Sequence, residues 1–210
     1  GESTDVPDTD TVITNREKNA SSNTVTIETN DKNDKVEVTL KDVNIDTSSR
    51  NKAAVSVTGE GDTNIKLDGD NALKSDIYRS GIYGSGSLTI SGGTVTANGD
   101  DGGRGISSSG SVTISGGSTV TANGGNGGSL VGGDGIRSGG GLTVSDGTVT
   151  AKGGNGDSKD GYGGDGIRSG GVVTISGNTV NAAGGSGSYG GDGIGSSSGG
   201  LTISGGTVTA

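Results

Sequence analysis

The sequence contains no cysteine and no histidine, and its only aromatic residues are four tyrosines. Without cysteine the chain can form neither a disulfide framework nor a thiolate metal site. Hydrolases built on a Ser-His-Asp or Cys-His arrangement are excluded by the absence of these two residue types. The absence of Phe and Trp also excludes a thick aromatic core.

Basic residues are in the minority, with 15 Lys and Arg against 24 Asp and Glu, which gives a formal net charge of −9. Phosphate binding needs Lys and Arg clustered on one face, so no nucleic-acid partner is expected. No apolar run approaches the roughly 20 residues of a membrane span, and no segment has the pattern of a signal peptide. We therefore expect no membrane span.

Glycine is abundant, with 48 residues, whereas proline occurs once. Glycine at this level without a three-residue period is usually typical of disordered low-complexity segments. Here the glycine clusters recur at regular intervals between short apolar alternations, a pattern that indicates turns joining strands. We therefore expect a folded repeat protein.

From residue 81 onward the repeat is explicit, and each copy contains a Gly-Ile start followed by a variant of L-T-I-S-G-G-T-V-T-A. The alternation of apolar and polar residues predicts three short strands per copy. Such a unit cannot bury an apolar face alone, so the copies must stack. The copies begin at Gly81-Ile82, Gly105-Ile106, Gly135-Ile136, Gly166-Ile167 and Gly193-Ile194.

These copies predict an all-β fold, a right-handed single-stranded parallel β-helix with three strands per coil and about seven coils. Residues 1–10 are expected to be a disordered acidic lead-in. A single domain over residues 11–210 would contain less regular coils at 11–80 and regular coils at 81–210. A strand at the end of the sequence without a polar cap indicates a longer native chain. The coil count follows the second apolar residue of each middle strand, which gives Leu40, Leu67, Ile90, Ile114, Val144, Ile175 and Ile203.

Stacking at about 4.8 Å per coil would turn equivalent residues into columns. One predicted core column starts at Ile82 and another at Val95, while glycines at the corners are expected to supply positive φ angles. Most variation in repeat length falls after T-V-T-A, which predicts a loop that projects at one corner.

The coils, together with V-E-V-T-L-K-D-V-N-I and A-A-V-S-V, resemble a family of carbohydrate-binding parallel β-helix proteins of bacterial surfaces. The resemblance covers most of residues 25–210. It implies a secreted or surface-displayed protein that binds calcium and an acidic plant polysaccharide such as polygalacturonate. Similar coils occur in adhesins and polysaccharide lyases, so the repeat is more specific for the fold than for the ligand.

An aspartate precedes the Gly-Ile start of three coils, at Asp134, Asp165 and Asp192. Carboxylates stacked about 4.8 Å apart would repel one another by roughly 1 kcal/mol in water. Calcium would remove this cost, because it accepts six to eight oxygen ligands in flexible geometry. The alternative is that each aspartate caps a tight turn. Further candidate ligands in the adjoining loops are Asp101, Asn126 and Asn155.

Tyr162 and Tyr189 each lie three residues before one of these aspartates. Stacked rings beside the carboxylates predict a sugar-binding surface, with rings that cover the glycine-rich loop as the alternative. Arg137 and Arg168 are expected to stack beside them, either as sugar contacts or as a solvated basic column. In a calcium-dependent polysaccharide lyase, an arginine in this column would be the base.

The leading hypothesis is therefore a non-enzymatic, extracellular carbohydrate-binding or adhesion module of a bacterial surface. Its partner would be an acidic plant or cell-surface polysaccharide, and other surface proteins are further possible partners. A structural stalk without a specific ligand is the main alternative, and a lyase is a further one. Outward Thr-x-Thr pairs such as Thr94 and Thr96 resemble ice-binding solenoids, although threonine is common on any exposed β-surface.

Overall fold

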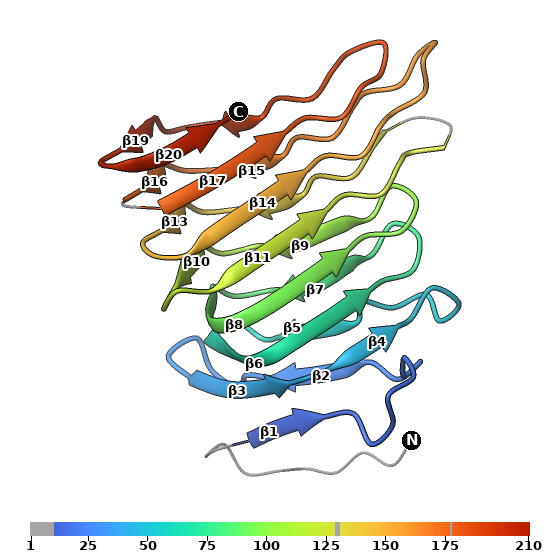
Figure 1. The fold of residues 1–210 in the computed structure, drawn as a ribbon, viewed down its shortest axis with the longest axis vertical. Coiled ribbons are helices and arrows are strands. Elements are labelled where there is room, and N and C mark those ends of the chain that lie inside the picture. The colour runs from blue at the N-terminus through green and yellow to red at the C-terminus, as the bar shows by residue number, and fades with distance from the viewer. Residues whose placement is uncertain (1–10, 129–130, 177) are drawn as a thin grey trace.

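The computed structural model describes residues 11–128, 131–176 and 178–210. Every regular element in this part of the chain is a β-strand, and the strands form a 13-stranded and a 7-stranded parallel sheet. In Figure 1 the chain crosses the front from left to right and returns behind as it rises, which makes the solenoid right-handed. The predicted parallel β-helix of about seven coils is confirmed. The predicted lead-in, residues 1–10, lies outside the described residues.

The 7-stranded sheet contains the first strand of each coil, which in the later coils is the Gly-Ile strand. Its strands are β2 (Val25–Glu28), β5 (Val55–Thr58), β7 (Ser80–Gly84), β9 (Arg104–Ser108), β12 (Ile136–Ser138), β15 (Ile167–Ser169) and β18 (Ile194–Ser196).

The 13-stranded sheet contains the middle and third strands of each coil, and in two coils these merge into one long strand. Its lowest strand is β1 (Thr11–Thr14), and the two long strands are β6 (Asp62–Lys74) and β8 (Leu88–Asn98). The remaining middle strands are β3 (Lys35–Lys41), β10 (Val112–Ser115), β13 (Leu142–Val144), β16 (Val173–Ile175) and β19 (Leu201–Ile203). The other third strands are β4 (Asn44–Asp46), β11 (Thr119–Asn123), β14 (Thr148–Lys152), β17 (Asn178–Ala183) and β20 (Gly206–Thr209).

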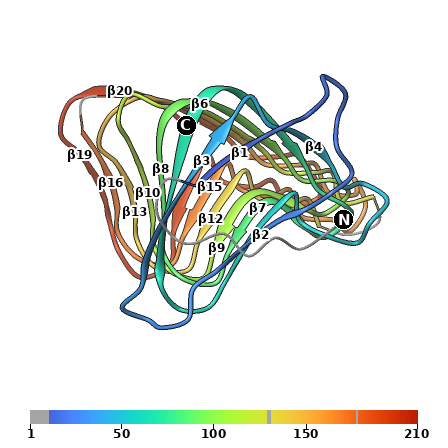
Figure 2. The ribbon, with the colours of Figure 1, turned by 90° about the horizontal axis from the view of Figure 1, so that it is seen from below.

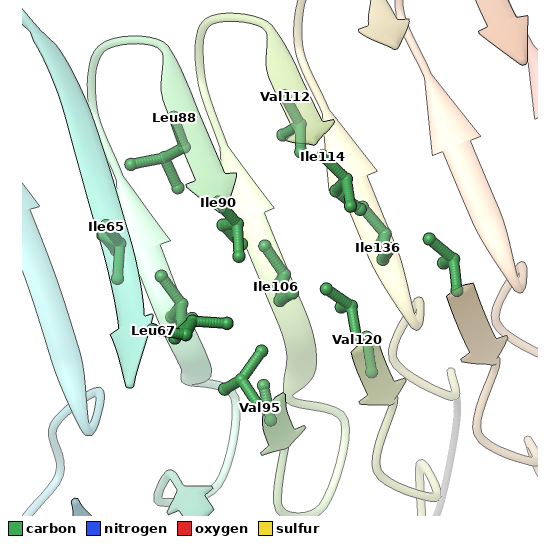
Figure 3. Close-up of a cluster of buried hydrophobic side chains, with 14 of the residues drawn as sticks. Ile65, Leu67, Leu88, Ile90, Val95, Ile106, Val112, Ile114, Val120 and Ile136 are labelled. Atoms are coloured by element: carbon green, nitrogen blue, oxygen red, sulfur yellow. The ribbon is translucent and has the colours of Figure 1, made fainter. Parts of the chain in front are cut away.

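The two predicted core columns are confirmed by the strand register. Isoleucine stacks on isoleucine from Ile82 in β7 to Ile194 in β18. Valine stacks on valine from Val95 in β8 to Val208 in β20. Figure 3 shows side chains of both columns among the labelled core residues. In the fourth to sixth coils the members of both columns are fully buried, since a coil covers them on each side.

The coil alignment predicted for the first two coils is wrong by two residues. Leu40 does lie beside Leu67, but Leu67 lies beside Gly92, and the partner of Ile90 is Ile65. β3 and β6 place an additional buried leucine, Leu40 and Leu67, at the position where β8 turns at Gly92. The register of β6 against β8 then shifts between Leu67 and Asp70. Asn71 follows this shift and occupies the place of a core valine.

Glycines serve two different purposes at the corners. Between the middle and third strands, Gly92 and Gly147 have φ values of 75° and 113°, as a sharp reversal requires. The glycine-rich segments between the third strand and the next coil differ from the prediction that corner glycines have positive φ angles. In their described parts only Gly102 has a positive φ.

We call these segments the insertion corner, and they comprise residues 99–103, 124–128, 131–135, 153–166 and 184–193. They project together from one corner of the roughly triangular cross-section (Figure 2). The outgoing leg of a corner donates a backbone hydrogen bond to the returning leg of the corner below, and the returning leg donates one to the outgoing leg of its own corner, with lengths of 2.8–2.9 Å. The relay runs through Gly103, Gly125, Gly133, Gly154, Gly164, Gly185 and Gly191.

Glycine is required in this relay because the backbones approach too closely for a side chain. A Cβ atom on Gly133 would lie 1.7 Å from the carbonyl oxygen of Gly103, and one on Gly164 would lie 2.0 Å from that of Gly133. The insertion corner is therefore a hydrogen-bonded layer of backbone, which gives the neighbouring side chains a fixed support.

We expect Gly164→Ala to lower the free energy of unfolding by about 3 kcal/mol, because its Cβ would overlap a backbone oxygen that cannot move alone. For a chain of this size that corresponds to a fall in Tm of about 6–12 °C, measurable by circular dichroism. Gly200→Ala is the matched control, since a Cβ there meets nothing within 4 Å. Equal Tm values for the two variants would show that the layer is loosely packed.

Candidate functional site

The predicted aspartate column lies at the base of the insertion corner. The Oδ1 atom of Asp134 accepts a hydrogen bond of 3.0 Å from the amide of Asp165, and that of Asp165 accepts one of 2.8 Å from the amide of Asp192. Each carboxylate thus joins its own coil to the next one. The aspartates therefore accept hydrogen bonds from backbone amides, as the turn-capping alternative predicted, but these amides belong to the following coil and not to the same turn.

An arginine column runs beside the aspartates, and Arg137 stacks on Arg168 as predicted. Arg137 lies 3.7 Å from Asp134, and Arg168 lies 3.8 Å from Asp165. Arg104 contributes a third guanidinium, 3.4 Å from Asp134, although it occupies the aspartate position of its own coil. These arginines offset part of the repulsion between the stacked carboxylates.

The pKa values reflect this crowding of charges. Burial raises the pKa of Asp165, the amide of Asp192 lowers it, and the Asp134 and Asp192 carboxylates raise it further against the effect of Arg168. Burial also lowers the pKa of Arg137, as does repulsion from Arg104 and Arg168, while Asp134 and Asp165 oppose that change. The charged forms of both groups are therefore kept at a cost to the fold.

The seventh coil breaks the pattern of one arginine per aspartate. The residue that stacks on Arg168 is Gly195, so Asp192 has no arginine three positions after it. Among the described residues no ion pair of Asp192 within 4.0 Å is found. Asp192 is also exposed, whereas Asp134 is buried.

Tyr162 and Tyr189 stack as predicted, with ring centroids 4.8 Å apart and an angle of 14° between the planes. Their backbones pair with each other, and that of Tyr162 also pairs with Val131 in the coil below. The facing sides of the two rings are thus covered by stacking, while the side chains remain 52% and 62% exposed overall. A ligand therefore cannot enter between the two rings.

These columns meet in one groove of about 520 Å³, which we call the corner groove. It brings together the three arginines, the three aspartates of the column and Tyr162, with glycine backbone as its floor. Tyr189 adjoins it through the ring stack. Tyr78 also lines the groove.

Tyr78 and Arg104 were not identified as site residues from the sequence. Tyr78 lies three residues before Gly81-Ile82, similar to the four residues that separate Tyr162 from Gly166. That spacing was the available signal. Arg104 directly precedes Gly105-Ile106, where the later coils have an aspartate.

The other predicted metal ligands do not line the groove. Asp101 accepts a hydrogen bond from the amide of Gly128, Asn126 accepts one from the amide of Asn155, and Asn155 accepts one from the amide of Ser186. Their side-chain oxygens thus join neighbouring coils. Within residues 11–128, 131–176 and 178–210, no three His, Cys, Asp or Glu side chains form a group that could hold a metal ion.

We expect Asp165→Asn to raise Tm at pH 7, because it keeps an oxygen that accepts the Asp192 amide and removes the disfavoured charge. A carboxyl pKa raised by folding costs stability above that pKa, and the cost disappears as the pH falls below the value of the unfolded chain. The gain should therefore be present at pH 7 and absent near pH 3. We expect it to stay below about 1 kcal/mol, since the carboxylate is partly solvated.

Thermal unfolding of Asp165→Asn, Asp165→Ala and Asp146→Asn at both pH values checks this. Asp146 is exposed at the corner between β13 and β14 and should change Tm little. Asp165→Ala removes the acceptor and should lower Tm. A loss of stability at pH 7 as large in the Asn variant as in the Ala variant would refute the role of the charge.

Comparison with known proteins supports the fold and names no ligand. Three stretches of the chain, residues 88–111, 142–167 and 201–210, match the family model of the β-helix repeat. No curated protein and no solved structure matches the chain. No helix in the described residues is long and apolar enough to span a membrane. Over these three stretches the chain is thus similar to β-helix repeat proteins.

Proposed function

We propose that the corner groove binds an acidic polysaccharide and does not cleave it. The observation that carries this proposal is the joint lining of one groove by arginines, aspartates and tyrosines from successive coils. Arginine donates to carboxylates, aspartate accepts from hydroxyls, and an aromatic ring packs on the apolar face of a sugar. A uronate offers all three chemical groups.

The arginines retain donors for a ligand. The contacts of Arg137 and Arg168 with their aspartates, 3.7 and 3.8 Å, are longer than a charge-assisted hydrogen bond. Their side chains are 42% and 50% exposed, so a carboxylate can approach them from the groove. The planar guanidinium group suits such a partner because it can donate two parallel hydrogen bonds.

Calcium belongs to the proposal as an auxiliary partner. The column carries a carboxylate without an arginine at Asp192, which is exposed. A cation held between this carboxylate and a uronate would join two negatively charged partners, in a protein whose net charge is −9. In this proposal the protein acts outside the cell, at a bacterial surface where such polysaccharides are present.

Affinity electrophoresis in gels containing polygalacturonate tests the proposal. We expect the polymer to retard the protein, and Arg137→Ala with Arg168→Ala to weaken binding at least tenfold, which is about 1.4 kcal/mol. Tyr162→Ala with Tyr189→Ala should weaken it several-fold. Lys41→Ala with Lys66→Ala is the matched control, since it removes the same charge from side chains outside the groove.

The same gels run with a chelator separate two versions of the proposal. Loss of retardation would indicate a calcium bridge, and unchanged retardation would indicate direct binding by the arginines. Absence of retardation by several acidic polysaccharides would support a structural stalk instead. Ultraviolet absorbance from unsaturated uronate products would contradict the non-enzymatic function and support a lyase.

A second candidate function, ice binding, is favoured by the register of the outward threonines. Two columns of these residues run over β8, β11, β14, β17 and β20. Successive members of one column are about 4.8 Å apart along the solenoid axis, and the two columns are roughly 6.6 Å apart along each strand. Every member is at least partly exposed. The first column is Thr94, Thr119, Thr148, Thr179 and Thr207, and the second is Thr96, Thr121, Thr150, Asn181 and Thr209.

Measurement of thermal hysteresis tests this candidate. If the array binds ice, crystals grown with the protein should be faceted, and Thr121→Lys with Thr150→Lys should reduce the hysteresis to less than half. Lysine would interrupt the regular surface without entering the core. Freezing without hysteresis or crystal shaping would eliminate ice binding.

A further inference from the structure

Tyr78 adopts a backbone conformation that is unusual for a bulky residue. Its φ is 55°, in the left-handed region, where residues other than glycine, asparagine and aspartate are rarely found. Its side chain is also 71% exposed, the largest value among the exposed large hydrophobic residues. Burial of the ring therefore does not compensate for the unfavourable backbone. Such strain is often associated with functional sites.

The surrounding turn enforces this conformation. The amide of Tyr78 donates a 2.9 Å hydrogen bond to the carbonyl of Asp101 in the next coil. On the preceding side, the Asp76 carboxylate accepts hydrogen bonds from the amides of Ile77 and Asn51. These contacts fix residues 76–78 between two coils.

The ring is supported on one side by bare backbone. A Cβ atom built on Gly102 would lie 2.7 Å from two ring carbons of Tyr78, so the ring packs where a side chain is missing. Gly102 itself has a φ of 64°. Among the described residues Tyr78 has no stacked aromatic partner, in contrast to Tyr162 and Tyr189.

Tyr78 and Tyr162 lie at different levels of the corner groove. The corner that contains Tyr78 precedes β7, and those that contain Val131 and Tyr162 precede β12 and β15. Tyr78 and Tyr162 are thus three coils apart, about 14 Å at 4.8 Å per coil. Each of the three coils above Tyr78 supplies one guanidinium to the groove, from Arg104 in β9, Arg137 in β12 and Arg168 in β15. The groove therefore runs along the solenoid axis.

We infer that the corner groove takes its ligand as an extended anionic oligosaccharide parallel to the solenoid axis, and that Tyr78 is a binding residue at its lower end. This inference rests on the proposed function. Three coil steps of about 4.8 Å match the length of about four units of an extended pyranose chain, since one pyranose ring and its glycosidic oxygen span a similar distance. The outer face of the Tyr78 ring would pack against one sugar, while the arginines contact the carboxylates of the others.

Calorimetric titration with galacturonate oligomers of one to six units tests the inference. We expect the affinity of the unmodified protein to rise with length up to about four units and then to level off. Tyr78→Gly should weaken binding of the four-unit oligomer about tenfold without lowering Tm, because glycine relieves the positive φ. Tyr78→Phe keeps the ring and should bind like the unmodified protein.

Tyr83→Ala is the matched control, since Tyr83 lies outside the groove in the same coil and is 38% exposed. It should leave binding unchanged. Equal affinity for one unit and for six, or unaltered binding by Tyr78→Gly, would overturn the inference while the proposed function stands. If no oligomer and no polygalacturonate binds the unmodified protein, the proposed function fails as well.

Discussion

Parallel backbone hydrogen bonding between coils is the interaction on which the other features of this molecule depend. It sets the register, so that isoleucine lies on isoleucine from β7 to β18 and valine on valine from β8 to β20. Burial of an aliphatic side chain contributes roughly 1.5–3 kcal/mol, and here each coil needs its neighbours for that burial. The hydrophobic core is therefore a property of stacked coils and is absent from a single one.

The same register imposes a cost on charged residues, because it brings like charges into columns. The aspartate column is stabilised by amides of the following coil and by arginines beside it. Burial, together with the neighbouring carboxylates of Asp134 and Asp192, still raises the pKa of Asp165. Charged groups that are incompletely paired and reachable from a groove are suited to binding a polar ligand. In this protein the repetition that builds the core also builds the candidate site.

Much of the fold could be predicted from the sequence, because the alternation in Leu88-Thr89-Ile90 and its equivalents states directly which side chains point inward. The register of β6 could not, since the shift after Leu67 depends on backbone geometry at Gly69 and on the buried side chain of Asn71. The Asn71 amide oxygen accepts a hydrogen bond from Val43 of the preceding coil. A sequence pattern does not contain such a long-range contact.

At the site, the stacking of Tyr162 on Tyr189 and of Arg137 on Arg168 followed from equal spacing to the Gly-Ile start. The role of Arg104 could not be predicted in this way, because Arg104 stands where the later coils have an aspartate. The role of Tyr78 could not be predicted either, because a positive φ angle at a tyrosine is not evident from the sequence. The separation of Asp101, Asn126 and Asn155 from the groove also required the structure. These side chains bind backbone amides of adjacent coils, which composition alone does not reveal.

The glycine layer of the insertion corner has a consequence for how this protein can change in evolution. At its relay positions even a methyl group would overlap a backbone atom, so these positions cannot acquire new side chains. Variation is thereby directed to the places where a side chain already leaves the layer, among them Val131, Tyr162 and Tyr189, and to Tyr78 beside it. Exchanges at these places would alter the chemistry of the groove while the layer beneath stays the same. The rigidity of the backbone thus concentrates the opportunity for new specificity in a small set of residues.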